Sequence, residues 1–175
     1  MEVRLLTSAA AAEHLGQVWA LLDEAFGADF SEDDWAHCLG GTDVVLLDGA
    51  MVVTHAAVMS RTLEVGGRPL RTGYVEGVAT RRGREGAGFA TLVMTEVDAL
   101  IRDRFELGAL STERHGFYER LGWERWRGPT AVRSPSGLIR TEEEDDGVLV
   151  LRFGPSAALD LRAPITCAAR PGDAW

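Results

Sequence analysis

The chain has 175 residues, 46% hydrophobic and 26% charged, which suits one globular domain with a substantial core. Its 27 acidic residues outnumber its 18 basic ones, every basic residue is arginine, and the formal charge of −9 disfavours nucleic acid and suits a cationic partner. Because no apolar run approaches the roughly 18 residues that cross a bilayer and the N-terminus has no signal-peptide pattern, we expect a cytoplasmic protein that does not bind membranes.

The first third of the chain predicts an edge strand, two helices and a hairpin. Leu15, Val18, Trp19, Leu22 and Phe26 recur at the spacing of one helix face. The elements that we expect are a strand at 3–6, a helix at 8–26, a second helix that Ser31 caps and that ends at Gly40-Gly41, and strands at 44–47 and 51–61 around the turn Asp48-Gly49.

The rest of the chain predicts a strand-helix-strand unit followed by shorter elements. We expect a strand at 70–79, a helix from Gly86 to about Arg104, a strand at 107–111, a short helix at 112–121, a strand beginning at 123, a loop at 129–137 and a strand at 148–153. The tail from Gly154 is left unassigned because it alternates small, apolar and turn residues.

A glycine- and arginine-rich loop between the strand at 70–79 and the long helix is the main candidate ligand site. Gly83, Gly86 and Gly88 allow a ligand to approach the backbone, and a helix N-terminus attracts anions. Neighbouring arginines, at 81, 82 and 84, add positive charge. The loop therefore suits a pyrophosphate, although a flexible turn has the same composition.

Two short motifs resemble signatures of the GNAT N-acetyltransferases. The spacing Gly86-x-Gly88 before a long helix is similar to their acetyl-CoA loop, with Gly83 at a position where that family usually has Gln or Arg. The run Gly116–Trp123, GFYERLGW, resembles their second signature, a tyrosine helix that closes on glycine and an aromatic residue.

Longer blocks resemble one family within the GNAT superfamily, the aminoglycoside 2'-N-acetyltransferases. These blocks occur in the family's order and read AFGADF and DW at 25–35, LGG at 39–41, HAAV at 55–58, GYVEGVA at 73–79, LGALS at 107–111, GPT at 128–130 and GDAW at 172–175. The stretch 112–117 is two residues shorter than the family pattern.

The resemblance implies a fold, a donor and an acceptor. It implies one GNAT domain over residues 1–175, an α/β (α+β) fold whose central, mainly antiparallel mixed sheet is flanked by helices and has splayed strands at the acetyl-CoA site. It further implies a homodimer that acetylates aminoglycoside antibiotics with acetyl-CoA and so confers resistance. The implied cofactor contacts are Val78, Ala79, Arg81, Arg82, Gly83, Arg84, Gly86, Ala87, Gly88 and Phe89.

Acetyl transfer from a thioester to an amine needs a base, an acid and a donor to the carbonyl oxygen. Glu76 is our candidate for the base, acting directly or through water, because a carboxylate in an apolar strand is costly to bury. Tyr118 is the candidate for the acid, since a phenol keeps its proton at neutral pH. The backbone N–H of Val78 is the candidate donor. A salt-bridged glutamate and a core tyrosine are the structural alternatives.

A polycationic acceptor calls for carboxylates in its binding site. The acidic run 142–146 fits this need, although a solvated loop explains it equally well. By the resemblance, the substrate contacts are Asp29, Asp34, Glu76, Ser111, Asp145, Asp173 and the terminal carboxylate of Trp175. No metal is expected, because Cys38, Cys167 and the four dispersed histidines have no metal-ligand spacing, and a reducing compartment argues against a disulfide.

Two other functions agree with these residues. One is a GNAT enzyme that acetylates a different small amine, such as a polyamine or a precursor of the cell envelope or of mycothiol. The other is a binding protein that sequesters a cationic drug or senses acetyl-CoA without turnover. The presence of both Glu76 and Tyr118 argues against the second, because a binder needs neither an acid nor a base.

Overall fold

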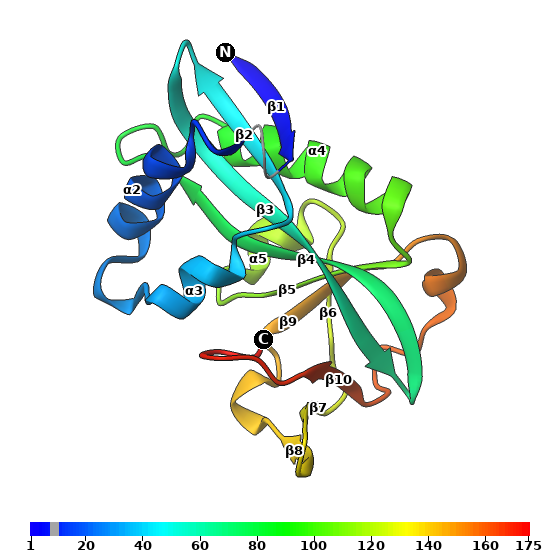
Figure 1. Cartoon of the computed structure of the whole chain (residues 1–175). Coiled ribbons are helices and arrows are strands. Elements are labelled where there is room, and N and C mark those ends of the chain that lie inside the picture. Colours follow the sequence, from blue (N-terminus) through cyan, green and yellow to red (C-terminus); the bar gives the residue numbers. More distant parts are fainter. Residues whose placement is uncertain (8–10) are drawn as a thin grey trace. The chain divides into compact units, whose positions relative to one another are not determined.

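The computed structural model describes residues 1–7 and 11–175, which divide into two compact units. Unit 1 comprises Met1–Met59 and Val75–Leu100, and unit 2 comprises Ser60–Tyr74 and Ile101–Trp175. Strands β3 (Met51–Val65) and β4 (Arg68–Thr80) are long, and each contributes residues to both units (Figure 1). Both units contain parts of these two strands, so among the described residues no linker separates them. The expectation of a single domain over residues 1–175 stays a prediction.

Unit 1 contains an antiparallel set of strands. Strand β1 (Glu2–Thr7) pairs with β2 (Thr42–Asp48), and β2 pairs with β3 (Figure 1). Gly49, in the turn between β2 and β3, has a φ of 62°, which glycine adopts at little cost. The predicted hairpin at Asp48-Gly49 is confirmed.

The described part of unit 1 also contains the α-helices α2 (Leu15–Phe26), α3 (Glu32–His37) and the part of α4 (Phe89–Arg104) up to Leu100. Helix α2 begins later than predicted, and residues 8–10 of the predicted helix lie outside the described residues. Ser31 caps α3 as predicted, with its hydroxyl accepting a bond from the N–H of Asp34. The buried face of α2 packs Val18, Leu21 and Leu22 into one apolar cluster with β2 and β3.

Unit 2 is built on a mixed, mainly antiparallel sheet, as predicted. Strands β4–β5 and β7–β10 pair in parallel, and the β5–β9, β6–β9, β3–β10 and β7–β8 pairs are antiparallel. The strand order is β6 (Glu124–Arg125), β9 (Val148–Leu151), β5 (Leu107–Ser111), β4, β3, β10 (Ile165–Ala168), β7 (Thr130–Ser134) and β8 (Gly137–Arg140). The other elements are α5 (His115–Glu119) and the short 3-10 helices η2 (Glu142–Glu144) and η3 (Gly154–Ala158). A further 3-10 helix, η1 (Gly27–Asp29), belongs to unit 1.

The prediction of a loop at 129–137 is wrong, because Thr130–Ser134 forms β7 and β8 begins at Gly137. Pro129 and Pro135 flank only five strand residues, too few for a clear periodic signal. Strand β7 pairs in parallel with β10, which lies in the tail that the sequence left unassigned. A strand stabilised by so distant a partner leaves little local trace in the sequence.

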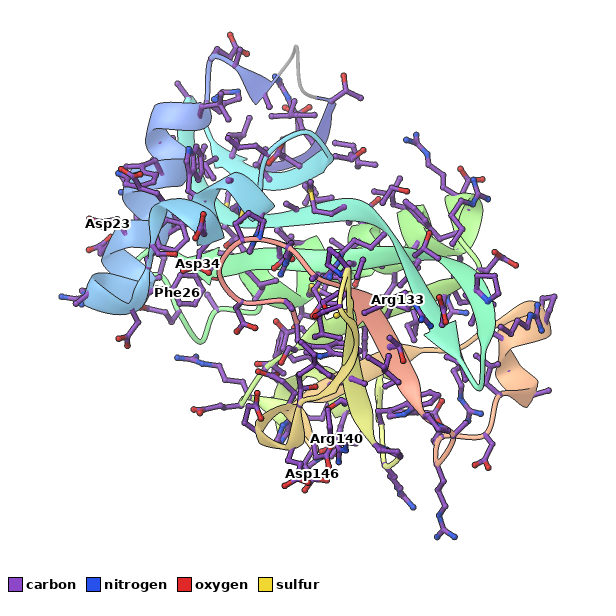
Figure 2. All side chains as sticks on the ribbon, turned by 60° about the horizontal axis from the view of Figure 1, so that its bottom comes forward. Asp23, Phe26, Asp34, Arg133, Arg140 and Asp146 are labelled. Carbon is purple, nitrogen blue, oxygen red and sulfur yellow. The ribbon has the colours of Figure 1, made fainter. Side chains whose placement is uncertain are left out.

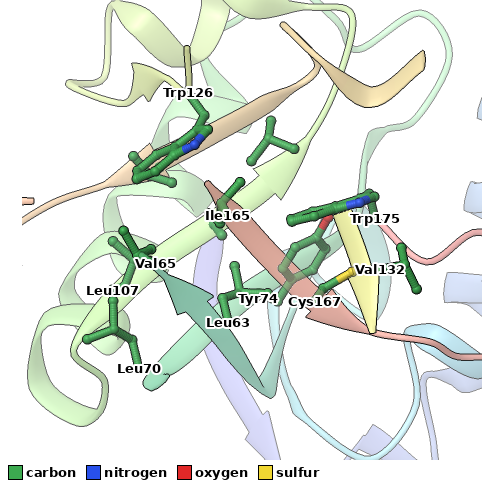
Figure 3. Packing of buried hydrophobic residues seen from close by; sticks show 13 residues of the cluster. Leu63, Val65, Leu70, Tyr74, Leu107, Trp126, Val132, Ile165, Cys167 and Trp175 are labelled. Atoms are coloured by element: carbon green, nitrogen blue, oxygen red, sulfur yellow. The ribbon is translucent and has the colours of Figure 1, made fainter. Parts of the chain in front are cut away.

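The core of unit 2 includes the last residue of the chain. Trp175 is 4% exposed and belongs to one apolar cluster with Tyr74, Val132 and Cys167 (Figure 3). Burying so large a side chain contributes roughly 2–3 kcal/mol. Trp175 therefore anchors the tail in the core of unit 2.

Candidate functional site

The loop between β4 and α4 in unit 1 combines left-handed glycines with open surroundings. Gly83, Gly86 and Gly88 have φ values of 77°, 74° and 80°, and a Cβ built on any of them has no neighbour within 4 Å. No acidic residue lies in the first turn of α4. The first N–H groups of a helix have no partner within that helix, so this end of α4 is suited to an anion.

The three arginines of this loop have different surroundings. The guanidinium of Arg81 donates to the carbonyl oxygen of Val52 at 3.1 Å, and its backbone N–H donates to that of Val53 at 2.8 Å. Arg84 donates to Asp48 Oδ2 at 2.7 Å. Arg82 has a side chain that is 78% exposed and its nearest acidic oxygen, on Glu24, is 4.0 Å away. Of the three loop arginines, Arg82 therefore has the weakest contacts within the protein.

The remaining predicted cofactor contacts divide into backbone and side-chain positions. Ala79 is buried in the apolar cluster of unit 1, so only its backbone is placed to contact a ligand. Ala87 is exposed, and the ring of Phe89 lies 5.8 Å from the guanidinium carbon of Arg84. Val78 is half-buried near the end of β4.

Glu76 lies within β4 rather than at its end, and is half-buried. The next residue, Gly77, has a φ of 57°. A Cβ at Gly77 would lie 2.8 Å from Cys38 Sγ and 3.2 Å from Leu22 Cδ1. Both the backbone angle and the packing therefore require glycine directly after the candidate base.

The two predicted substrate aspartates of unit 1 lie near the junction of α2 and α3. Asp29 is exposed at the end of η1. Asp34 already has a structural role, because its Oδ2 accepts bonds from the backbone N–H and the hydroxyl of Ser31, at 2.8 and 2.7 Å. Figure 2 labels Asp34 on α3 and Phe26 at the end of α2.

Tyr118 of unit 2 is a buried phenol on α5. Its ring is 6% exposed and packs edge-on against Phe117 and Trp123. Burial raises the pKa of Tyr118 to about 12, although the charge of Arg114 acts in the opposite direction. Tyr118 therefore keeps its proton throughout the physiological pH range, as the role of an acid requires.

Ser111 of unit 2 binds a glutamate that the sequence analysis did not select. Its hydroxyl donates to Glu144 Oε2 at 3.2 Å. Burial raises the pKa of Glu144, and the negative charge of Asp173 raises it further. The structure thus brings Ser111, Glu144 and Asp173 together, with two carboxylates that repel one another and favour a cation.

Asp145, the member of the acidic run chosen from the sequence, is bound to its own unit. Its two oxygens accept a bidentate interaction from Arg140, and Oδ1 also accepts from the backbone N–H and hydroxyl of Thr130, at 3.1 and 3.0 Å. Arg140 lowers the pKa of Asp145. Figure 2 shows Arg140 and Asp146 at the same end of unit 2.

Asp173 and Trp175 are held by bonds within the tail and to the sheet. The backbone N–H of Trp175 donates to Asp173 Oδ1 at 3.1 Å, and its indole N–H donates to Thr141 Oγ1 at 3.2 Å. Arg170 donates to the backbone oxygen of Asp173 at 2.7 Å. These bonds order the tail and fix the position of the Asp173 carboxylate.

Comparison with known proteins identifies the family. Residues 7–126 match the family model described as an acetyltransferase (GNAT) domain. The chain is 45% identical over 156 residues to the aminoglycoside 2'-N-acetyltransferase of Mycolicibacterium fortuitum, which covers 87% of this chain and 80% of that protein. The chain belongs to the aminoglycoside 2'-N-acetyltransferase family.

Solved structures confirm the GNAT fold of this family member. YhbS from Escherichia coli in complex with CoA aligns with a TM-score of 0.68 at 17% identity, over 95% of this chain and 88% of that one. A GNAT acetyltransferase from Brucella melitensis in complex with acetyl-CoA aligns with a TM-score of 0.63 at 15% identity, over 94% of each chain. The chain spans only 33% of the length of Eis1 from Mycobacterium abscessus, with a TM-score of 0.62 at 18% identity.

The predicted site residues of the acetyltransferase divide between the units. Unit 1 holds Asp29, Asp34, Glu76 and the loop from Val78 to Phe89, and unit 2 holds Ser111, Tyr118, Asp145, Asp173 and Trp175. Among residues 1–7 and 11–175, no cluster of three or more metal-ligating side chains occurs. Within the same described segments, none of the helices has the length and apolar character that crossing a bilayer demands.

Proposed function

We propose that this acetyltransferase transfers the acetyl group of acetyl-CoA to the 2'-amino group of aminoglycosides, and that it thereby protects its host from these antibiotics. The observation that carries the donor is the loop of Gly83, Gly86 and Gly88, open and left-handed, before the acid-free start of α4. The identity of 45% to a named aminoglycoside 2'-N-acetyltransferase supports the acceptor. Glu144 adds support: its carboxylate accepts from Ser111, the negative charge of Asp173 raises its pKa, and two repelling carboxylates suit an ammonium group.

The proposed chemistry is direct transfer in a ternary complex. The amine nitrogen attacks the thioester carbonyl, a C–N bond forms and the C–S bond breaks. Glu76 takes the proton that the amine loses, directly or through water, and Tyr118 gives a proton to the departing thiolate. The backbone N–H of Val78 stabilises the negative charge on the carbonyl oxygen.

The proposed contacts are those that the resemblance to the family implies. For acetyl-CoA they are the backbone of Val78, Ala79, Gly83, Gly86, Ala87 and Gly88 with the side chains of Arg81, Arg82, Arg84 and Phe89. For the aminoglycoside they are Asp29, Asp34, Glu76, Ser111, Asp173 and Trp175, and we propose Glu144 in place of Asp145, because Arg140 and Thr130 bind the Asp145 carboxylate. A homodimer and a cytoplasmic location accompany the proposal, and light scattering and cell fractionation test them.

The test is thiol release from acetyl-CoA with matched acceptors. Kanamycin B has an amine at the 2' position and kanamycin A has a hydroxyl there, so we expect turnover of kanamycin B and acetylation at its 2' nitrogen, read by NMR. Equal turnover of kanamycin A would contradict the regiochemistry. Turnover of spermidine alone would establish a different small-amine acetyltransferase, and binding without thiol release a binding protein.

Two variants test the proposed acid and base in the same assay. Glu76→Gln should lower kcat/KM by roughly 100-fold, with partial recovery at high pH where more free amine is present. Tyr118→Phe should lower kcat with little change in substrate binding. Because the pKa of Tyr118 is about 12, the wild-type rate should not fall between pH 8 and pH 10 through loss of its proton.

A further inference from the structure

A line of buried polar groups crosses three strands of unit 1 next to Glu76. His55 on β3 is fully buried, and its Nε2 lies 2.8 Å from Asp43 Oδ1 on β2. Its Nδ1 lies 2.7 Å from the carbonyl oxygen of Gly77 on β4. Asp43 is two residues from Val45, the register partner of His55, so it reaches the imidazole diagonally on the same sheet face.

The partners of His55 determine which ring nitrogen carries a proton. A carbonyl oxygen only accepts, so Nδ1 must carry a proton and donate to Gly77. The opposite nitrogen shares a further proton with Asp43, either as an imidazolium beside a carboxylate or as a neutral ring beside a carboxylic acid. The bond from Nδ1 to the Gly77 carbonyl is the same in both cases.

This bond fixes a peptide group that the proposed reaction uses. The carbonyl of Gly77 and the N–H of Val78 belong to one trans peptide, in which they point in opposite directions. Holding the carbonyl on the side of His55 therefore aims the Val78 N–H to the other side. A hydrogen bond to the carbonyl also polarises the peptide and strengthens its N–H as a donor.

The surroundings of Gly77 show why this peptide needs a side chain to orient it. We call the hydrogen bond from His55 Nδ1 to the carbonyl oxygen of Gly77 the clamp. Gly77 has a φ of 57° within a strand, so regular ladder geometry is interrupted there. The left-handed backbone is accessible to glycine but is one of several conformations that glycine adopts. His55 supplies the directional contact that selects one of them.

We propose that His55 and Asp43 are positioning residues, which orient the Gly77–Val78 peptide so that the Val78 N–H stabilises the oxyanion of acetyl transfer. This inference rests on the proposed reaction. It assigns a role to two residues that contact neither substrate. It also explains why an ionisable pair is retained in the core of unit 1, where an apolar pair costs less to bury.

The test compares a variant that breaks the clamp with one that keeps it. His55→Phe removes both ring donors, and we expect kcat with kanamycin B to fall by roughly 10- to 100-fold while KM for acetyl-CoA changes little. Asp43→Leu removes the partner of Nε2 and leaves the ring free to turn, so kcat should also fall, by a smaller factor than in His55→Phe. Asp43→Asn should restore kcat to within about threefold of the wild type, because the new amide donates to Nε2 while Nδ1 still donates to Gly77.

A control separates positioning from loss of stability. Thr54→Val removes a part-buried hydrogen bond between the same two strands, which joins the hydroxyls of Thr54 and Thr80 at 3.1 Å and does not involve Gly77. We expect Thr54→Val to lower the melting temperature and to leave kcat near the wild-type value. Wild-type kcat in His55→Phe, or an equal fall of kcat in Thr54→Val, would overturn the inference.

A measurement on the wild-type protein does not depend on turnover. Nitrogen NMR of the imidazoles, with the signal of His55 assigned by its loss in His55→Phe, should show a proton on Nδ1. An unprotonated Nδ1 overturns the clamp even if every kinetic result agrees. If kanamycin B is not a substrate, the proposed function fails. The same variants are then compared with spermidine as the acceptor. The NMR measurement still decides whether the hydrogen bond from His55 to Gly77 exists.

Discussion

The basic loop of unit 1 and the acidic run of unit 2 look alike in the sequence, since each is a cluster of like charges. In the structure, however, the members of each cluster differ in their partners. In the loop, Arg81 and Arg84 bind the β2–β3 hairpin and Arg82 stays in solvent. In the run, Asp145 binds Arg140, while Glu144 meets a hydroxyl and a second acid. Charges with close ionic partners shape the backbone, and we propose that the exposed Arg82 and the half-buried Glu144 are the ones that contact ligands.

The comparison makes Glu144→Gln the most disruptive change for aminoglycoside binding. A charge-assisted contact to an ammonium contributes about 1.5–3 kcal/mol, so KM for kanamycin B should rise roughly 10- to 100-fold. Because its pKa is raised in the fold, ionised Glu144 lowers stability once the pH exceeds that raised pKa, so the variant should be no less stable at pH 7. Unchanged kinetics would show that Glu144 is structural.

A bulky residue in the basic loop should have the next largest effect. At Gly88, where φ is 80°, valine adds strain of roughly 1–2 kcal/mol and fills open space, so KM for acetyl-CoA should rise about 10-fold. Gly67→Val is the matched control, because Gly67 has a φ of 84°, open surroundings and a place in the β3–β4 turn. Equal effects of the two variants on KM would mean that strain alone is responsible.

Asp145→Asn should change stability rather than catalysis. The side chains of Arg140 and Asp145 are 38% and 36% exposed, so solvent screening limits the loss at pH 7 to about 1 kcal/mol. The pKa of Asp145 is lowered by folding, so its contribution is present above about pH 4 and is lost as the pH falls through the lowered value. Denaturant titrations of both proteins should therefore converge in acid. A large rise in KM for kanamycin B without loss of stability would contradict this division of roles.

The smallest effect is expected for the exposed arginine. Arg82→Gln should raise KM for acetyl-CoA about 2- to 5-fold, since a solvent-exposed ionic contact contributes roughly 0.2–1 kcal/mol. Higher salt should reduce the difference between the variant and the wild type. Arg81→Gln is the comparison: it removes the bond to Val52 and should lower the melting temperature, whereas Arg82→Gln should not.

The sequence by itself determined the elements that carry their own local signal. The hairpin at Asp48-Gly49, the Ser31 cap and the strand at 107–111 follow from turn chemistry, capping and short apolar runs, and all three are present. The glycines before α4 were likewise predictable from the sequence, because glycine adopts a left-handed backbone at little cost.

The tertiary structure alone decided which charges are paired within the protein. Asp48 and Arg84 are 36 positions apart, and Ser111 and Glu144 are 33 apart, so no local pattern reveals either pair. Adjacent residues therefore have different surroundings. The Asp145 carboxylate binds Arg140 and Thr130, while Glu144 accepts from Ser111 and is repelled by the charge of Asp173. The strands β7 and β10 are likewise far apart in the sequence. Their pairing contributes free energy only after folding has brought the two strands together, so no local pattern predicts it.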